Sequence, residues 1–144
     1  MEELTDMIQE FQAIGQSTAE IIERVLRENE ITVCEYVSVT QQFERGQDGL
    51  GRSLGSYRPY TIEIKQMKNQ PTDRITLEDT GAFHRGFYID FYPDGFSIRS
   101  TASQKGDIDL IEHWEEDIMD INDENMTDLM ENYVMPEIIK AFEQ

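Results

Sequence analysis

Several oxygen-bearing side chains in the C-terminal third of the chain have the spacing of a calcium-binding loop. Carboxylate and amide oxygens at such intervals can surround a Ca²⁺ ion when helical segments flank them. The matching residues are Asp120, Asn122, Glu124, Asp128 and Glu131. Asn125, however, stands where the sharp turn of such a loop needs glycine. We therefore favour a simpler interpretation, in which Asp120 or Asn122 caps the following helix, and we expect no metal site.

Side chains that could act as nucleophiles or bases are scarce and lie outside any catalytic motif. A nucleophile needs a base within hydrogen-bonding distance, and the candidates are Cys34, His84 and His113. We expect a structural role for each, and therefore no catalytic residue, no cofactor and no enzymatic activity. The glycines of residues 46–55 lack the Lys and Ser or Thr that complete a phosphate-binding loop, so we interpret them as loop-formers.

The elements that hold these residues begin with a long amphipathic helix. Large apolar residues recur at helical spacing from residue 3 to residue 29, which predicts a single apolar stripe. The stripe consists of Leu4, Met7, Ile8, Phe11, Ile14, Ile21, Ile22, Val25 and Leu26. We expect it to face the core of the protein itself and not a purely intermolecular coiled coil. Gly15 interrupts the stripe, which indicates a bend or a close packing contact.

The middle of the chain is predicted to contain loops and short strands. Residues 31–44 fit either a strand, because of their β-branched residues, or a second helix. Residues 45–60 are rich in glycine and are predicted to form a long loop, of a kind that is usually functional or ordered by a partner. Thr61 to Met67 and Arg74 to Leu77 are predicted to be short strands, with a turn at Asn69 to Asp73 between them.

A hairpin and a set of helices complete the predicted α+β fold. Apolar and polar residues alternate in residues 87–92, and the turn Pro93-Asp94-Gly95 leads into a second strand. Helical spacing returns in residues 107–119 and 123–142, where Pro136 is expected to break the last helix near Met135.

The length predicts a single domain over all 144 residues. Within it we expect an N-terminal helical region at 1–44, a loop and antiparallel strands at 45–105, and C-terminal helices at 106–144. No apolar run approaches the roughly 20 residues that span a membrane, so we expect a soluble, unprocessed chain with no membrane partner. The single cysteine excludes an internal disulfide.

The charge of the chain is negative and unevenly distributed. The net charge is −18, and such a surface would repel DNA, so we expect no sequence-specific binding of nucleic acid. Residues 1–44 carry 10 acidic and 2 basic groups, residues 45–105 carry 7 and 9, and residues 106–144 carry 13 and 1, which gives −8, +2 and −12. Solvated helix faces would explain this division, and so would complementary faces on neighbouring subunits.

Three motifs in the middle of the chain follow one another in a distinctive order. A glycine-rich stretch runs from Gly49 to Tyr57, Thr61 and Lys65 follow it, and a Leu77-Glu78-Asp79-Thr80-Gly81-Ala82-Phe83 element leads to a strand at Phe87. In this order, residues 40–100 resemble the phage virion-morphogenesis and tail-completion proteins, with a weaker likeness at Asp117 to Pro136. The chain departs from the family pattern at Leu54, where a Trp is common, and at His84 to Gly86.

The resemblance implies a non-enzymatic structural subunit of a tailed bacteriophage: a head–tail connector, tail-completion or tail-terminator protein. Members of that family form oligomeric rings with portal, connector or tail proteins, in the virion and, during assembly, in the host cytoplasm. Thr80 and Gly81 fit a structural turn in which the glycine takes a positive φ. An alternative function is that of an acidic DNA mimic which inhibits a host DNA-binding enzyme. The candidate interface residues are Arg45, Arg52, Tyr57, Arg58, Trp114, Glu115, Glu116 and Asp117.

Overall fold

The protein is an α+β structure, 62% helical and 11% strand, as the sequence predicted. This computed structural model describes residues 2–93, 95–105, 108–114 and 116–143, and the side chains of all of them except 104, 105, 108, 109, 111, 112 and 116. Its contacts divide it into two compact units. We call them the helical unit, Met1–Asn29 with Thr127–Gln144, and the mixed unit, Glu30–Met126. Their boundaries differ from those of the three regions expected from the sequence.

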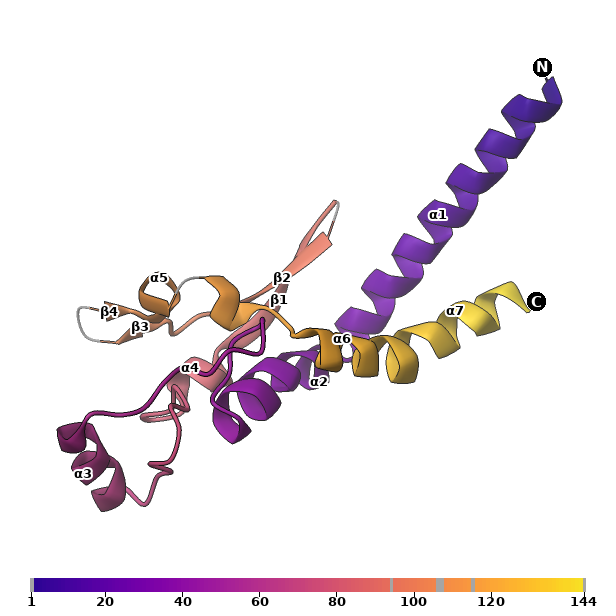
Figure 1. Cartoon of the computed structure of the whole chain (residues 1–144). Coiled ribbons are helices and arrows are strands. Elements are labelled where there is room, and N and C mark those ends of the chain that lie inside the picture. Colours follow the sequence, from indigo (N-terminus) through magenta and orange to yellow (C-terminus); the bar gives the residue numbers. More distant parts are fainter. Residues whose placement is uncertain (1, 94, 106–107, 115, 144) are drawn as a thin grey trace. The chain divides into compact units, whose positions relative to one another are not determined.

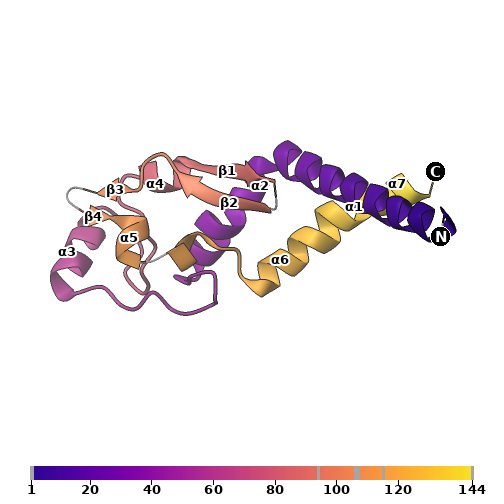
Figure 2. The ribbon, with the colours of Figure 1, turned by 90° about the horizontal axis from the view of Figure 1, so that it is seen from above.

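The helical unit is built on α1 (Glu2–Glu28), which confirms the predicted N-terminal helix. The helix continues unbroken through Gly15, and no described atom lies within 4 Å of a Cβ placed there, so the expected close packing contact is wrong. The last turns of α1 pack against the C-terminal helices, and Val25, Leu26, Leu129 and Val134 are buried there (Figures 1 and 2).

The C-terminal helix was predicted to break near Met135. It continues through this residue and changes there from π-helical to α-helical hydrogen bonding. It begins as α6 (Asp123–Leu129), continues as the π-helical η3 (Met130–Val134), and ends as α7 (Met135–Phe142). The amide of Met135 donates to the carbonyl of Met130, which is the wide hydrogen bond of a π turn. Pro136 follows in the first turn of α7, where its missing N–H costs little.

The mixed unit begins with helix, which decides the question that residues 31–44 left open. α2 (Glu30–Glu35) leads into the π-helical η1 (Tyr36–Glu44). A confirmed hairpin follows later in the chain, with β1 (Phe87–Tyr92) antiparallel to β2 (Gly95–Ser100). Ile89 pairs with Ile98, and both are buried. The predicted turn residue Asp94 lies outside the described residues.

Two predicted strands are wrong. Thr61 to Met67 belongs to a helix, α3 (Pro59–Met67), because Pro59 occupies the first helical turn and presets its φ. Arg74 to Leu77 is irregular and has no partner strand among the described residues. A side chain accepts a backbone hydrogen bond there that a partner strand would otherwise accept. The amide of Thr76 donates to the hydroxyl of Tyr57 at 2.9 Å, and Leu77 adopts a left-handed φ of 60°.

The region predicted to be helical at 107–119 is helical only in part. A small hairpin pairs β3 (Gln104–Lys105) with β4 (Ile108–Asp109), so the helix is wrong at residues 108 and 109. Residue 107 lies outside the described part of the chain. The short α5 (Leu110–Trp114) and the 3₁₀ helix η2 (Glu116–Met119) follow. A further short helix, α4 (Ala82–Arg85), precedes the larger hairpin.

Candidate functional site

A cluster of buried amides joins η1 to the segment before α6. The Gln41 side chain donates to the carbonyl of Asp120 at 2.9 Å and accepts from the amide of Asn122 at 2.8 Å and from the side chain of Asn125 at 3.0 Å. The Asn125 side chain also donates to the carbonyl of Tyr36 at 3.2 Å. Because Gln41, Asn122 and Asn125 are buried, their bonds replace those that water would otherwise make. The cluster therefore fixes the two segments to one another.

Gln42 extends this cluster to the predicted candidate His84. The Gln42 amide donates to the carbonyl of Ile118 at 2.7 Å, which leaves its oxygen to accept from Nε2 of His84 at 2.9 Å. Burial lowers the pKa of His84 to about 4, so the ring is neutral at pH 7 with its proton on Nε2. His84 thus has a structural contact, in line with the role expected for it.

The glycine-rich loop is ordered by contacts within the chain. Oδ1 of the buried Asp48 accepts from the amides of Leu50 and Arg52, both at 2.9 Å. Gly49 donates to the carbonyl of Asp117 at 2.7 Å, and a Cβ on Gly49 would lie 2.4 Å from Cβ of Asp120. Only glycine allows so close an approach, and this explains its place in the loop.

Two of the basic residues predicted to lie at the interface, Arg52 and Arg45, have acidic partners within the chain. Arg52 contacts Asp48 at 2.9 Å and Asp117 at 3.0 Å, and Arg45 contacts Glu124 at 3.0 Å. Some of the basic side chains in the middle of the sequence are thus paired with acidic side chains of the same mixed unit. A contact between subunits need not be invoked to explain it.

The other predicted interface residues that the structure describes have separate local contacts. Tyr57 is half-buried and bonds to Thr76, Arg58 is exposed just before α3, and Trp114 packs edge-on against His113 with ring centres 5.2 Å apart. Glu115 and the side chain of Glu116 lie outside the described residues.

The turn predicted at Thr80 and Gly81 has the expected geometry. Gly81 takes a positive φ of 86°, and the Thr80 hydroxyl accepts from the amide of Ala82 at 3.3 Å. The turn leads into α4, and Phe83 is buried with its ring edge-on to that of Phe87, 5.0 Å between centres. The turn therefore leads directly into the helix that carries Phe83.

One of the residues considered for calcium, Asn122, caps a helix. Oδ1 of Asn122 accepts from the amide of Asn125 at 2.8 Å, which confirms Asn122 as the cap of α6. Among the described residues, no group of three or more His, Cys, Asp or Glu side chains is placed to hold a metal ion. Burial, followed by the nearby charges of Glu30 and Glu35, raises the pKa of the Cys34 thiol to about 12. This thiol is protonated at neutral pH and is a poor nucleophile.

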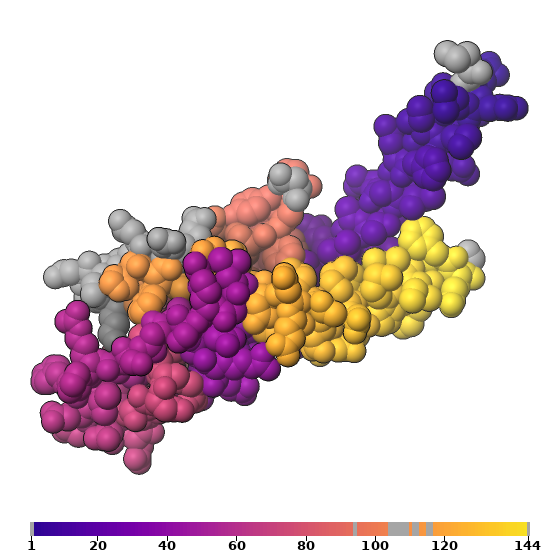
Figure 3. Space-filling view, in the orientation of Figure 1, coloured from indigo at the N-terminus to yellow at the C-terminus, as the bar shows by residue number. Residues whose placement is uncertain are grey.

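An apolar surface that is open to a partner lies on α1. The C-terminal helices cover only the last turns of α1, as Figure 3 shows for the helical unit, so the expected core-facing stripe is present only there. The first half of the stripe is 47–67% exposed; we call it the α1 stripe, and it consists of Leu4, Met7, Ile8, Phe11 and Ile14. An exposed apolar patch of this kind is typical of an interaction surface. The helical spacing revealed the stripe, and the sequence could not show that the C-terminal helices of the helical unit leave its first half exposed.

The size of the α1 stripe indicates what a partner must supply. Full burial of a large apolar side chain contributes about 1.5–3 kcal/mol. Since the stripe residues are only 47–67% exposed, each has roughly 1 kcal/mol left to gain, or about 5 kcal/mol together. Association itself costs about 4–15 kcal/mol. A partner must therefore bring apolar surface of its own.

Comparisons with protein-family models, curated proteins and solved structures found no match. None of the described helices is long and apolar enough to cross a membrane.

Proposed function

We propose that the chain is a non-enzymatic structural subunit of a tailed bacteriophage virion. In this proposal it self-associates into a ring at the head–tail junction, as a connector, tail-completion or tail-terminator protein, and meets portal or tail proteins there. The observation that carries the proposal is the exposed α1 stripe, because a chain that leaves it open to water gains stability from covering it in an assembly. The order of motifs in residues 40–100 supports the phage setting.

The rigidity of the mixed unit fits a part whose function is geometric. Buried amides hold η1 to the segment before α6, and the glycine-rich loop is ordered by Asp48 and Gly49. A ring subunit must present its faces at fixed angles, or the ring does not close. The proposal no longer depends on a basic loop that reaches an acidic neighbour, since Arg52 and Arg45 have partners within the chain.

A DNA mimic is the second candidate, and the charge of α1 favours it. Residues 2–22 carry five acidic side chains and no basic one: Glu2, Glu3, Asp6, Glu10 and Glu20. A mimic would act as a small species that binds a basic enzyme, and the binding would collapse with added salt. The same segment carries the α1 stripe, which a mimic of phosphates does not need. We therefore prefer the structural function.

The test introduces single substitutions into the gene for this chain in the phage that encodes it. Phe11→Asp puts a charge into the α1 stripe, and Gln9→Asp puts the same charge on the opposite, exposed face of the helix. Purified particles are then analysed by mass spectrometry and electron microscopy. We expect the protein in particles made with the unmodified chain and with Gln9→Asp, and separate heads and tails with Phe11→Asp.

Absence of the protein from mature particles that carry the unmodified gene would overturn the proposal. Circular dichroism of both purified variants checks that α1 still folds. If Phe11→Asp keeps its helix content and still fails to assemble, the defect lies in the α1 stripe and not in folding.

A further inference from the structure

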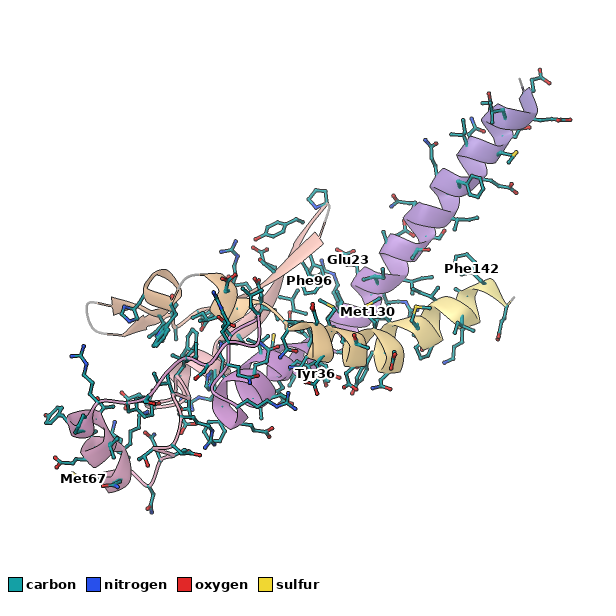
Figure 4. The ribbon with its side chains drawn as sticks, in the orientation of Figure 1. Glu23, Tyr36, Met67, Phe96, Met130 and Phe142 are labelled. Atoms are coloured by element: carbon teal, nitrogen blue, oxygen red, sulfur yellow. The ribbon has the colours of Figure 1, made fainter. Side chains whose placement is uncertain are left out.

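The helical unit carries a second exposed apolar face, on α7. Met135, Ile139 and Phe142 are 41–51% exposed, and steps of four and three residues place them on one side of the helix. We call them the α7 face; Figure 4 shows Phe142 at the outer end of α7. The α7 face and the α1 stripe therefore belong to the same compact unit.

Within one chain, α7 does not extend far enough to cover the α1 stripe. Val25 and Val134 are buried where α1 packs against the C-terminal helices. Since a helix rises about 1.5 Å per residue, α7 continues only about 12 Å beyond Val134. Ile14, the nearest residue of the stripe, already lies about 16 Å from Val25 along α1. The stripe is thus left for a partner from outside the helical unit.

The apolar spacing along α1 is nearly symmetric about the point between residues 14 and 15. If two copies of α1 run antiparallel and cross at this point, Met7 of one copy comes opposite Ile22 of the other, and Ile8 comes opposite Ile21. Ile21 and Ile22 are half-buried, so both still have apolar surface to offer.

The two central pairs of this arrangement join a large side chain to a small residue. Phe11 comes opposite Thr18, and Ile14 comes opposite Gly15. Gly15 is exposed, and no described atom lies within 4 Å of a Cβ placed on it, so there is room for Ile14 of the second copy. Large side chains that meet small ones interdigitate, as in a well-packed core. A parallel pair would instead set Phe11 against Phe11 and leave the space at Gly15 open.

The outer end of the pattern brings in the α7 face. Leu4 comes opposite Val25, which is buried under the C-terminal helices, α7 among them. Leu4 of one copy therefore meets the C-terminal helices of the other.

We propose that two copies of the chain pair through antiparallel α1 helices, with the α7 face of each copy against the α1 stripe of the other. This inference rests on the proposed function, since it names the contact through which the chain self-associates. The contact is isologous, because both copies use the same surface. It yields pairs of subunits, and a ring is then built from such pairs through a further contact.

The apolar area available is what a stable pair requires. A half-exposed large apolar side chain offers about 100 Å² for burial. The α1 stripe and the α7 face together have eight such residues and offer roughly 800 Å² per copy, which is about the area that each partner buries in a stable interface of standard size. The α1 stripe by itself would offer only roughly 500 Å², so the α7 face is needed.

A chain with two new cysteines, Met7→Cys and Ile22→Cys, tests the direction and register of the α1 pair. A disulfide forms only where two Cα atoms come within about 7 Å. Residues 7 and 22 of one chain are about 22 Å apart along α1, so a 7–22 link must join two chains. The full-length protein is oxidised, digested at glutamate, and its linked peptides are identified by mass spectrometry. Met7→Cys alone and the unmodified chain, whose Cys34 is buried, are the controls.

We expect the double variant to form a covalent dimer through 7–22 links, and both controls to stay without a link. Predominant 7–7 and 22–22 links would indicate a parallel pair and overturn the inference. A double variant that self-associates without forming any link would overturn it as well.

Ile139→Asp tests the part played by the α7 face. Ala141→Asp is the matched control, because it adds the same charge at an exposed position on the other side of the same helix. Light scattering over a series of concentrations gives the dissociation constant of each variant, and circular dichroism checks that its helices are retained. We expect Ile139→Asp to raise the dissociation constant by at least about tenfold, and the control to leave it unchanged. Equal association of the two variants would overturn the contact with the α7 face.

These outcomes separate the inference from the proposed function. Self-association with the wrong links overturns the α1 pair while the proposed function stands. A monomer for the unmodified chain would overturn the proposed function and the α1 pair with it.

Discussion

Replacement of Gln41 by Met tests how the mixed unit is held together. Methionine has nearly the volume of glutamine, so the change removes hydrogen bonds without opening a cavity. Three bonds are lost: one to the carbonyl of Asp120 at 2.9 Å, one from the amide of Asn122 at 2.8 Å and one from the side chain of Asn125 at 3.0 Å.

The expected loss follows from what each partner can do afterwards. Asn122 is buried, and its unsatisfied amide costs about 1–3 kcal/mol. Asp120 is exposed, so its carbonyl can meet water and the net loss there is about 0.5–1.5 kcal/mol. Asn125 retains its bond to Tyr36. The unfolding free energy should therefore fall by about 3 kcal/mol.

Urea unfolding followed by circular dichroism measures this loss. The comparison is made in the Phe11→Asp background, because self-association would otherwise make apparent stability depend on concentration. Gln66→Met on the exposed side of α3 is the control, and it should change stability by less than about 0.5 kcal/mol. Hydrogen exchange should also show faster exchange at the Asn122 amide. A loss below about 1 kcal/mol, or one equal to that of the control, would refute the importance of the cluster.

Further changes give predictions of both signs. Gly49→Ala should destabilise the protein by about 2 kcal/mol, because the new Cβ would lie 2.4 Å from that of Asp120, whereas Gly15→Ala should stabilise it by up to about 1 kcal/mol in thermal or urea unfolding. The pKa of His84 is lowered to about 4 when folded, so the unfolded chain binds the proton first and stability falls as the pH drops from about 6.5 to about 4. His84→Gln should remove roughly 3 kcal/mol of that fall, measured as the difference between the two urea titrations across the pH range.

The sequence predicted those elements whose signals are local. The spacing of apolar residues gave α1, alternation gave the larger hairpin, and the positive φ at Gly81 and the cap at Asn122 followed from residue chemistry. Each of these depends on neighbours in the chain, so no tertiary contact had to be known in advance.

Features that depend on distant partners could not be predicted. Gln41 and Gln42 form their hydrogen bonds with groups far along the chain, and no pattern of residue spacing in the sequence predicts these bonds. Thr61 to Met67 was predicted to be a strand, yet Pro59 presets the first turn of a helix there. The exposure of the α1 stripe belongs to the same class, because periodicity shows that a helix has an apolar face and not what covers it.

The measurement that most directly tests the account is the molar mass of the unmodified chain in solution over a series of concentrations. A self-associating subunit should give a mass that rises with concentration to a fixed multiple of 16.8 kDa. A mass of 16.8 kDa at every concentration would contradict the central claim that the exposed α1 stripe is an assembly surface.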